Sequence, residues 1–213
     1  MPEKLPLATI STSTEADITD RRSRFLCTLQ HVSSVEEAQN VIANVRQRDW
    51  DARHHCTAMI LGIDGEVVRS NDDGEPAGTA GAPMLSALQS AEVSDVVAVV
   101  TRWFGGVLLG TGGLVRAYTD AVNAALAKAH RVERRRMTVR KFQVSAADVG
   151  KVENSLRTWV KISSAVLAHV SYGQVATFEV HFELNYLDSF EMWRNQNAID
   201  VVEDLGVVVS KVG

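Results

Sequence analysis

The residues best suited to chemistry lie between Val99 and Ala121, in the stretch VVTRWFGGVLLGTGGLVRAYTDA. Five glycines separate an apolar run from a helical pattern. A glycine-rich turn at a helix N-terminus presents unpaired backbone N–H groups at the positive end of the helix dipole, and this suits phosphate or another anion. Two arginines flank the turn. We therefore predict an anion or nucleic-acid site formed by Arg102, Gly105, Gly106, Gly110, Thr111, Gly112, Gly113 and Arg116.

This turn matches neither of two common phosphate-binding motifs. No lysine follows the glycines, so the pattern G-x-x-x-x-G-K-[ST] is absent, and GTGGLVRA does not keep the spacing G-x-G-x-x-G. An alternative is that the glycines only let strand, turn and helix pack closely. Both readings remain open from the residues alone.

A second candidate is the loop RSNDDGEPAGTAGAPM, which places Asp72, Asp73 and Glu75 within four residues. Clustered carboxylates can bind a hard cation or act as acid and base, but the spacing is not that of an EF-hand. In a Gly/Pro-rich loop they more often bond nearby backbone N–H groups. We predict a recognition surface including Thr79 and His54, and no metal site.

A third candidate is His54-His55-Cys56. On a strand, His54 and Cys56 point to the same face, so an imidazole-activated thiolate is conceivable. Ala58 and Ile60 share that face, however, and a row of small core residues is the simpler interpretation. We predict no catalytic residue, and the chain is more typical of a binding protein than of an enzyme.

A fourth candidate is the basic run RVERRRMTVRK, from which Arg134, Arg135 and Arg136 join the predicted anion or nucleic-acid site. Such runs usually form a solvated face, but they also suit nucleic-acid phosphate. The aromatic signature of RRM domains is absent, so direct base stacking in this part is not expected.

The elements that must position these residues form an α+β protein of two domains. Residues 23–32 and 95–104 read as strands, residues 55–70 as a hairpin turning at Asp64-Gly65, and residues 34–48 and 113–130 as helices. We predict a mixed α/β domain over residues 17–131. Residues 136–213 read as β-α-β-β-α-β, the ferredoxin-like plan. Residues 1–16 are predicted to be disordered.

Composition limits the class of protein. The 213 residues are 46% hydrophobic and 23% charged, which is ordinary for globular proteins. Two cysteines are too few for a disulfide framework, and the N-terminal stretch has no apolar segment typical of a signal peptide or membrane span. We expect a cytoplasmic, reduced protein with no membrane contact and no cofactor. The net charge of −4 argues only weakly against a nucleic-acid binder, because it hides local patches.

Taken together, DARHHCTAMIL, RSNDDGEPAGTAGAPML and VVTRWFGGVLLGTGGLVRAYTDAV resemble the YigZ/IMPACT family. The resemblance implies a first domain like the second domain of a small-subunit ribosomal protein and like GHMP-type kinases. It implies a ferredoxin-like second domain similar to domains of elongation factor G. Two departures are Leu108, where members often have lysine, and His55, where they often have asparagine. The remaining motif positions are His54, Cys56, Asp72, Asp73, Gly74, Glu75, Pro76, Thr79, Gly81, Arg102, Phe104, Gly105, Gly106, Gly110, Gly112, Gly113, Arg116 and Tyr118.

The resemblance also implies a role in translation, because eukaryotic relatives regulate translation through protein contacts. We therefore expect a non-enzymatic, translation-linked protein that contacts RNA, the ribosome or a ribosome-associated protein. The alternative is an enzyme or binder acting on a phosphorylated or nucleotide small molecule through the glycine-rich turn. The sequence does not determine the oligomeric state.

Overall fold

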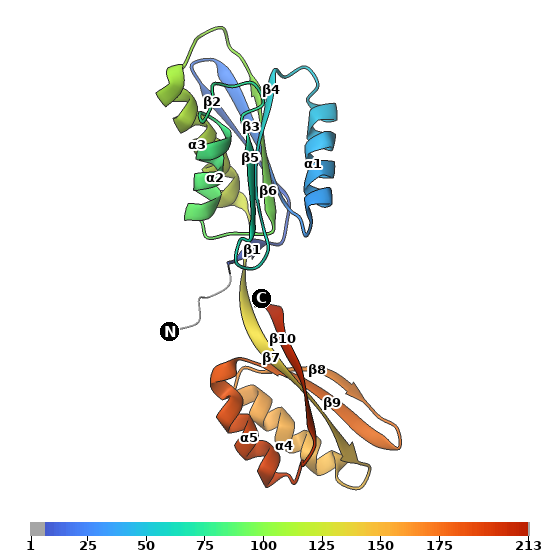
Figure 1. The fold of residues 1–213 in the computed structure, drawn as a ribbon. Coiled ribbons are helices and arrows are strands. Elements are labelled where there is room, and N and C mark those ends of the chain that lie inside the picture. The colour runs from blue at the N-terminus through green and yellow to red at the C-terminus, as the bar shows by residue number, and fades with distance from the viewer. Residues whose placement is uncertain (1–6, 213) are drawn as a thin grey trace. The chain divides into compact units, whose positions relative to one another are not determined.

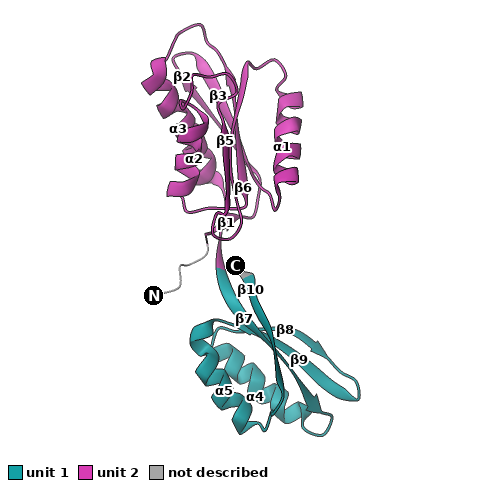
Figure 2. Ribbon diagram, viewed as in Figure 1, with its two compact units in different colours: residues 1, 3, 135–212 teal, residues 2, 4–134, 213 magenta. Residues whose placement is uncertain are grey.

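The computed structural model describes residues 7–212, which form an α+β protein with two five-stranded sheets. Contacts divide them into two compact units, which meet in sequence between Arg134 and Arg135 (Figure 2). The sequence-based boundaries, by comparison, are 131 and 136.

The first unit is an antiparallel sheet in the order β2-β3-β6-β4-β5, with helices on both faces (Figure 1). Helix α1 covers one face, and helices α2 and α3 cover the other. The central strand β6 is buried over nearly its whole length because both its faces are covered, which explains its continuous apolar run. The bounds are β2 Thr14–Asp20, β3 Ser23–His31, α1 Val35–Arg48, β4 His54–Leu61, β5 Val67–Asn71, α2 Gly81–Ser90, β6 Val96–Trp103 and α3 Gly110–Lys128.

Local sequence accounts for the helix that begins after Ser34. The Ser34 side chain accepts a hydrogen bond from the Glu37 backbone N–H at 3.1 Å, while the Glu37 carboxylate accepts one from the Ser33 N–H at 2.6 Å. This arrangement satisfies backbone donors that a helix N-terminus otherwise leaves unpaired. Ala38, Val41 and Val45 then fall on the face buried against the sheet.

The strand registers bring the chemically interesting segments to one end of this sheet. Arg24 pairs with Trp103, and His54 pairs with Arg102. The β2–β3 turn, the start of β4 and the end of β6 therefore lie at the same end. The glycine-rich turn follows β6 there and leads into α3.

The second unit has the predicted order β-α-β-β-α-β, with strands arranged β10-β7-β9-β8. Helices α4 and α5 pack on one face around an aromatic core that includes Phe142, Phe178, Trp159 and Phe190. A single 3-10 turn, Leu184–Tyr186, precedes α5. The bounds are β7 Arg131–Ser145, α4 Val149–Ile162, β8 Val166–Ser171, β9 Val175–Phe182, α5 Leu187–Gln196 and β10 Val202–Val212.

The prediction of disorder over residues 1–16 is wrong for the described part of that segment. Thr9–Ile10 form β1, which pairs with the start of β7 at Val132 and Arg131, and Glu15 lies within β2. Ala8 and Ile10 are buried in the core. The polar STST composition hid β1 and the start of β2. Strand β1 pairs with β7, far away in sequence, whereas β2 pairs with the neighbouring strand β3. Residues 1–6 lie outside the described residues.

Gly105 illustrates how tightly the end of β6 packs. A Cβ at Gly105 would lie 2.1 Å from the backbone C and O atoms of Arg22, whereas a Cβ at Gly112 would meet no atom within 4 Å. We expect Gly105→Ala to lower the free energy of unfolding by about 1–3 kcal/mol, because the β2–β3 turn must shift. Gly112→Ala should leave it unchanged or raise it by up to about 1 kcal/mol, since alanine is the better helix former.

Urea-induced unfolding of both variants, followed by circular dichroism, measures this difference. Equal stability of the two variants would show that the backbone of Arg22 does not constrain position 105.

Candidate functional site

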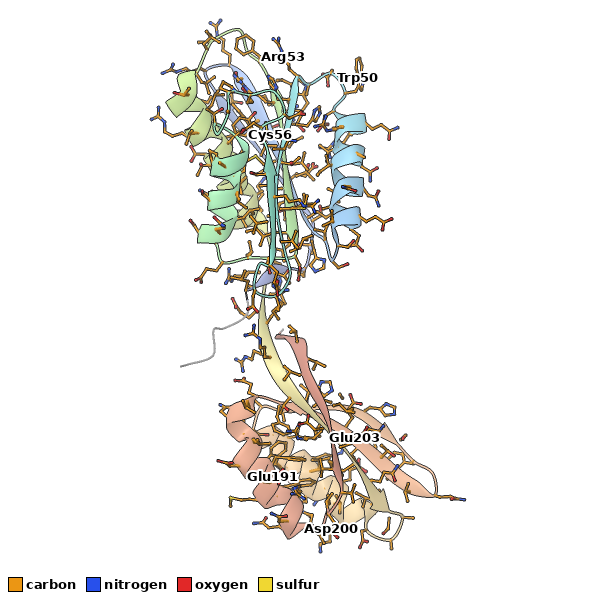
Figure 3. The ribbon with its side chains drawn as sticks, in the orientation of Figure 1. Trp50, Arg53, Cys56, Glu191, Asp200 and Glu203 are labelled. Atoms are coloured by element: carbon orange, nitrogen blue, oxygen red, sulfur yellow. The ribbon has the colours of Figure 1, made fainter. Side chains whose placement is uncertain are left out.

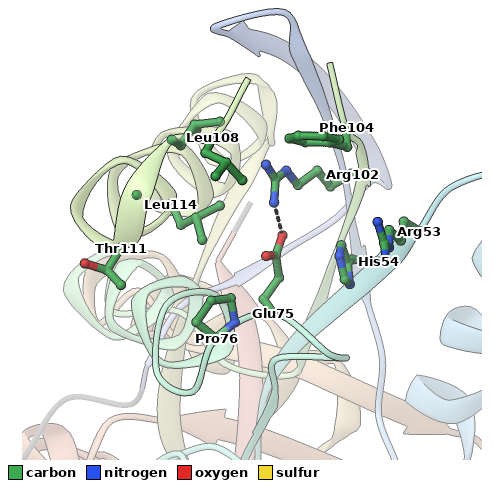
Figure 4. Close-up of a pocket in the computed structure, with 11 residues that line it drawn as sticks. Arg53, His54, Glu75, Pro76, Arg102, Phe104, Leu108, Thr111 and Leu114 are labelled. Atoms are coloured by element: carbon green, nitrogen blue, oxygen red, sulfur yellow. Dashed lines mark hydrogen bonds and ion pairs between the residues drawn. The ribbon is translucent and has the colours of Figure 1, made fainter. Parts of the chain in front are cut away.

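A cavity of about 360 Å³ opens at the end of the first sheet, beside the glycine-rich turn (Figure 4). Its wall is mainly apolar. The α3 side contributes Leu108 and Leu114, the residue that follows β6 is Phe104, and the loop before α2 contributes Pro76. Arg53 and His54 add polar groups from the start of β4. A concave, largely apolar site with a few polar groups is typical of ligand-binding cavities.

The glycine-rich turn forms one side of this cavity and begins helix α3. Gly106 and Gly110 adopt φ values of +83° and +72°, which side chains disfavour, so both glycines are required by conformation. Leu109 is the N-cap residue and supplies no capping side chain. The N–H groups of the first helical turn have no intrahelical acceptor, as at every helix N-terminus, and no capping side chain accepts from them here. Gly110 and Thr111, at this start of the helix, line the cavity.

The cavity rests on a buried ion pair. The Arg102 Nη1 atom lies 2.6 Å from Glu75 Oε1, and both side chains are more than nine-tenths buried. Tyr118 donates a hydrogen bond to the same Glu75 oxygen at 2.7 Å. The Cys56 Sγ atom lies 3.2 Å from the Tyr118 hydroxyl. A chain of polar contacts thus joins β6, the loop before α2, helix α3 and β4.

One donor of the Arg102 guanidinium has no acceptor. Its Nε atom is one of two buried side-chain polar atoms without a hydrogen-bond partner in the described residues, the other being Thr9 Oγ1. Its Nη2 group reaches Ser23 only at 3.5 Å. The guanidinium also lies 5.5 Å from the Phe104 ring centroid and 5.4 Å from that of Phe25. Buried unpaired donors are uncommon, and this one belongs to a residue in the cavity wall.

The carboxylates of the acidic loop are used to build the loop itself. Asp72 accepts hydrogen bonds from the backbone N–H groups of Gly78, Ala80 and Gly81. Burial alone would raise the Asp72 pKa, but these three donors outweigh it and hold the pKa below its ordinary value. Asp72 therefore fixes the start of α2 and is not a free recognition group.

Asp73 is held in the same way. Burial would raise its pKa, but the His55 backbone N–H, at 2.7 Å, and the Arg46 guanidinium outweigh burial and lower the pKa. Asp73 itself adopts φ of +45°, a left-handed conformation that its hydrogen bonds support. Through Asp73, the loop between β5 and α2 is bonded to the start of β4 and to helix α1.

Two further residues of the predicted recognition surface have different environments. Thr79 is buried, and its hydroxyl donates to the Pro76 carbonyl at 2.6 Å. His54 is half-buried and lines the cavity. Its Nδ1 atom lies 2.9 Å from the Asp73 carbonyl oxygen, which can only accept. Nδ1 of a neutral His54 must therefore carry the proton, leaving Nε2 as a hydrogen-bond acceptor.

The basic run does not form one anion-binding face. Arg134 is buried, pairs with Asp95 and donates to the Leu7 and Ala8 carbonyls and to Ser94. The prediction that Arg134 belongs to the anion site is contradicted, because its side chain is buried and bonded to protein groups. Side chains alternate between core and solvent along a strand, and that of Arg134 points to the core. Arg135 is exposed but pairs with Glu183, and Arg136 is partly buried on the same strand.

The structure separates Arg116 from the cavity and adds arginines that the sequence prediction missed. Arg116 is exposed on α3 and is not part of the cavity wall. Arg21 and Arg22 form the β2–β3 turn, and Arg53 precedes β4, all exposed at the cavity's end of the sheet. The pair Arg21-Arg22 directly before the predicted strand 23–32 was a usable signal, but the sequence did not show that this strand pairs with β6.

Within the described residues, no group of three or more His, Cys, Asp or Glu side chains could hold a metal ion. None of the helices described there is long and apolar enough to cross a membrane.

The Arg102–Glu75 pair should behave as a unit. Glu75→Leu alone leaves a buried guanidinium uncompensated, and we expect it to lower the free energy of unfolding by about 3–5 kcal/mol. The double variant Glu75→Leu/Arg102→Met removes both charges and should recover much of this loss. Urea unfolding of the two single variants and the double variant gives the coupling; strictly additive losses would contradict it.

Cys56 should be unreactive in the folded protein. Burial raises the pKa of both Cys56 and Cys27 to about 12, so both are protonated thiols at pH 8. We expect no alkylation by iodoacetamide at pH 8 within an hour, and rapid alkylation of both after denaturation in urea. Mass spectrometry counts the adducts, and fast modification of native Cys56 would restore it as a candidate nucleophile.

Comparison with known proteins places this architecture in a family. Residues 21–126 match the model of the Impact N-terminal domain. The chain is 38% identical to IMPACT family member YvyE of Bacillus subtilis over 188 residues, 88% of this chain and 85% of that protein. It is 50% identical to IMPACT family member YigZ of Escherichia coli over 108 residues, 50% of this chain and 53% of that protein.

A solved structure extends the similarity to both units. A crystal structure described as that of a hypothetical protein has a TM-score of 0.63 and 30% identity, covering 96% of this chain and 98% of its own. The Impact N-terminal domain match contains the cavity, the acidic loop and the glycine-rich turn, and the alignment with YvyE runs on into the second unit. The chain belongs to the IMPACT family, of the YigZ/YvyE type.

Proposed function

We propose that this protein is a non-enzymatic, cytoplasmic binding protein that acts in translation by contacting RNA, alone or on the ribosome. The contact surface is the end of the first unit that carries the cavity. The observation that carries this proposal is the set of exposed arginines around it. Arg21, Arg22 and Arg53 make no ion pair within the described residues, whereas Arg24, Arg46 and Arg102 are paired.

The geometry of the β2–β3 turn supports a functional reason for two of these arginines. Arg21 and Arg22 both adopt the left-handed conformation, with φ of 43° and 69°. Two-residue hairpin turns of this kind favour Asn-Gly, and a residue with a side chain pays roughly 1–2 kcal/mol for that conformation. Strained residues of this kind gather at functional sites. The turn places two arginines at the cavity's end of the sheet at a cost in stability.

The net charge of −4 is compatible with this surface. Association with nucleic acid depends on the local field, and exposed arginines that make no ion pair within the described residues favour a positive field at that end. The resemblance of the motifs to regulators of translation supports the proposal. The fold relationships that the resemblance implies, to a small-subunit ribosomal protein domain for the first unit and to elongation factor G domains for the second, support it further.

A second candidate is a binder or enzyme acting on a phosphorylated small molecule. The cavity of about 360 Å³ at an uncapped helix N-terminus favours it. Thermal-shift measurements with nucleotides, with and without Mg²⁺, test this second candidate, because a ligand of the folded state raises the melting temperature. Turnover of a nucleotide would establish an enzyme.

The RNA proposal predicts a strongly salt-dependent affinity. The variant Arg21→Gln/Arg22→Gln/Arg53→Gln should bind ribosomal RNA fragments and tRNA more weakly, and the slope of log K against log[salt] should fall by about 2–3. Fluorescence anisotropy with labelled RNA measures the affinity and its salt slope. The salt concentration runs from about 50 to about 300 mM, the range over which phosphate contacts weaken.

The control is Arg131→Gln/Arg135→Gln/Arg157→Gln, which removes the same charge from arginines paired with Glu133, Glu183 and Glu153. It should bind like the unmodified protein. Absence of binding to RNA and ribosomes at low salt, or an equal loss in the control, would refute the proposal. Ribosome binding that survives salt and nuclease would indicate a protein partner instead.

A further inference from the structure

We infer that the cavity binds one nucleotide, with its base against the apolar wall and its phosphate at the N-terminus of α3. The inference rests on the proposed function for the source of that nucleotide, which is an unpaired nucleotide of RNA. A free mononucleotide carries the same chemistry, and the experiment below separates the two sources.

The apolar wall suits a flat heterocycle. Phe104 is 43% exposed and Leu108 is 81% exposed, although both line the cavity. Leu114 lies on the same side as Leu108, across from Phe104, and Pro76 completes the wall (Figure 4). Bases unstacked from RNA are bound by stacking on aromatic side chains, and each such contact contributes on the order of 1–3 kcal/mol. The Phe104 ring is the exposed aromatic surface within this cavity.

The start of α3 suits a phosphate. The N–H groups of Gly110, Thr111 and Gly112 precede the first intrahelical hydrogen bond, and no side chain caps them. A Cβ at Gly110 or Gly112 would meet no protein atom within 4 Å, so the backbone is open to close approach. Gly112 has neither a positive φ nor a packing contact that requires glycine. Close approach of a ligand to its N–H group supplies a reason for this residue.

The unpaired Arg102 donor is an independent sign of a ligand. Arg102 lines the cavity, its side chain is more than nine-tenths buried, and its Nε–H has no acceptor in the described residues. Glu75 neutralises its charge through Nη1, so the guanidinium retains donors without an excess charge. An acceptor atom of a base or phosphate in the cavity can pair with this group after a small adjustment. Such pairing removes the free-energy cost of leaving a buried donor without a hydrogen bond.

The polar rim matches the remaining parts of a nucleotide. The His54 Nε2 atom is an acceptor because Nδ1 bonds the Asp73 carbonyl, and it can receive a hydrogen bond from a ribose hydroxyl or a base amine. Arg53 is exposed beside it and can neutralise a neighbouring phosphate. The cavity is at the small end of ligand sites, which span about 300–1,000 Å³, so it admits one nucleotide and not a duplex.

The test uses the full chain and an RNA hairpin with a single bulged 2-aminopurine, compared with the same hairpin fully paired. We expect the bulged RNA to bind about tenfold more tightly, with a change in 2-aminopurine fluorescence as the base enters the cavity. Thr111→Trp, which fills the mouth of the cavity from an exposed position, should abolish both the preference and the fluorescence change. Asn123→Trp, an exposed polar-to-tryptophan change farther along α3, should retain both.

The outcomes distinguish this inference from the proposed function. Equal, salt-sensitive binding of both hairpins would overturn the nucleotide site and leave RNA binding intact. Binding of AMP, GMP, CMP or UMP that Thr111→Trp abolishes, without RNA binding, would support the site with a free nucleotide as its ligand and refute the RNA proposal. Absence of binding to every probe would overturn both.

Discussion

The buried ion pair between Arg102 and Glu75 is the interaction on which the candidate site depends. Arg102 is on the central strand β6, and Glu75 is on the loop that leads into α2. The cost of burying these two charges is offset by their attraction and by further hydrogen bonds. Tyr118 donates one such bond to Glu75. The pair therefore holds the loop, the strand and helix α3 in one arrangement, and the cavity forms in the space they enclose.

The acidic loop shows how this constraint extends outward. Asp72 and Asp73 do not reach toward a ligand, because backbone N–H groups and Arg46 occupy them. Their carboxylates replace the regular pairing that a loop lacks, and so the segment between β5 and α2 keeps a fixed path without being helix or strand. The fixed path sets Pro76 in the cavity wall and gives His54 its hydrogen-bond partner. Residue types that suggest acid–base chemistry serve here to build the site.

Whether an arginine can attract an anion depends on whether it is already ion-paired, and not on how many basic residues lie near it in the sequence. The basic run that is most conspicuous in the sequence lies on β7, where ion pairs within the protein occupy Arg131, Arg134 and Arg135. Three exposed arginines that make no ion pair within residues 7–212, Arg21, Arg22 and Arg53, lie instead at the turn and strand end beside the cavity's end of the sheet. Local field, and not net charge, decides which anions a surface attracts, so these few residues outweigh the longer run.

The sequence by itself determined the family and most of the elements, with β1 and β2 as exceptions. Alternation and helical periodicity predicted helices α1 and α3 of the first unit and the β-α-β-β-α-β order of the second unit, and three motifs together identified the family. These features are local, since periodicity and capping depend on neighbours a few residues away. In the structure, Gly110, Thr111 and Arg102 all line the cavity.

The tertiary structure decided what each of these groups can do. It buried Arg134 and paired Arg102 with a carboxylate 27 positions away, and it brought Arg21, Arg22 and Arg53 to one end through the register of β3 and β4 with β6. Burial, pairing and register are contacts between residues distant in sequence. A charged side chain becomes a structural ion pair or a free binding group according to those distant contacts, which no local pattern records.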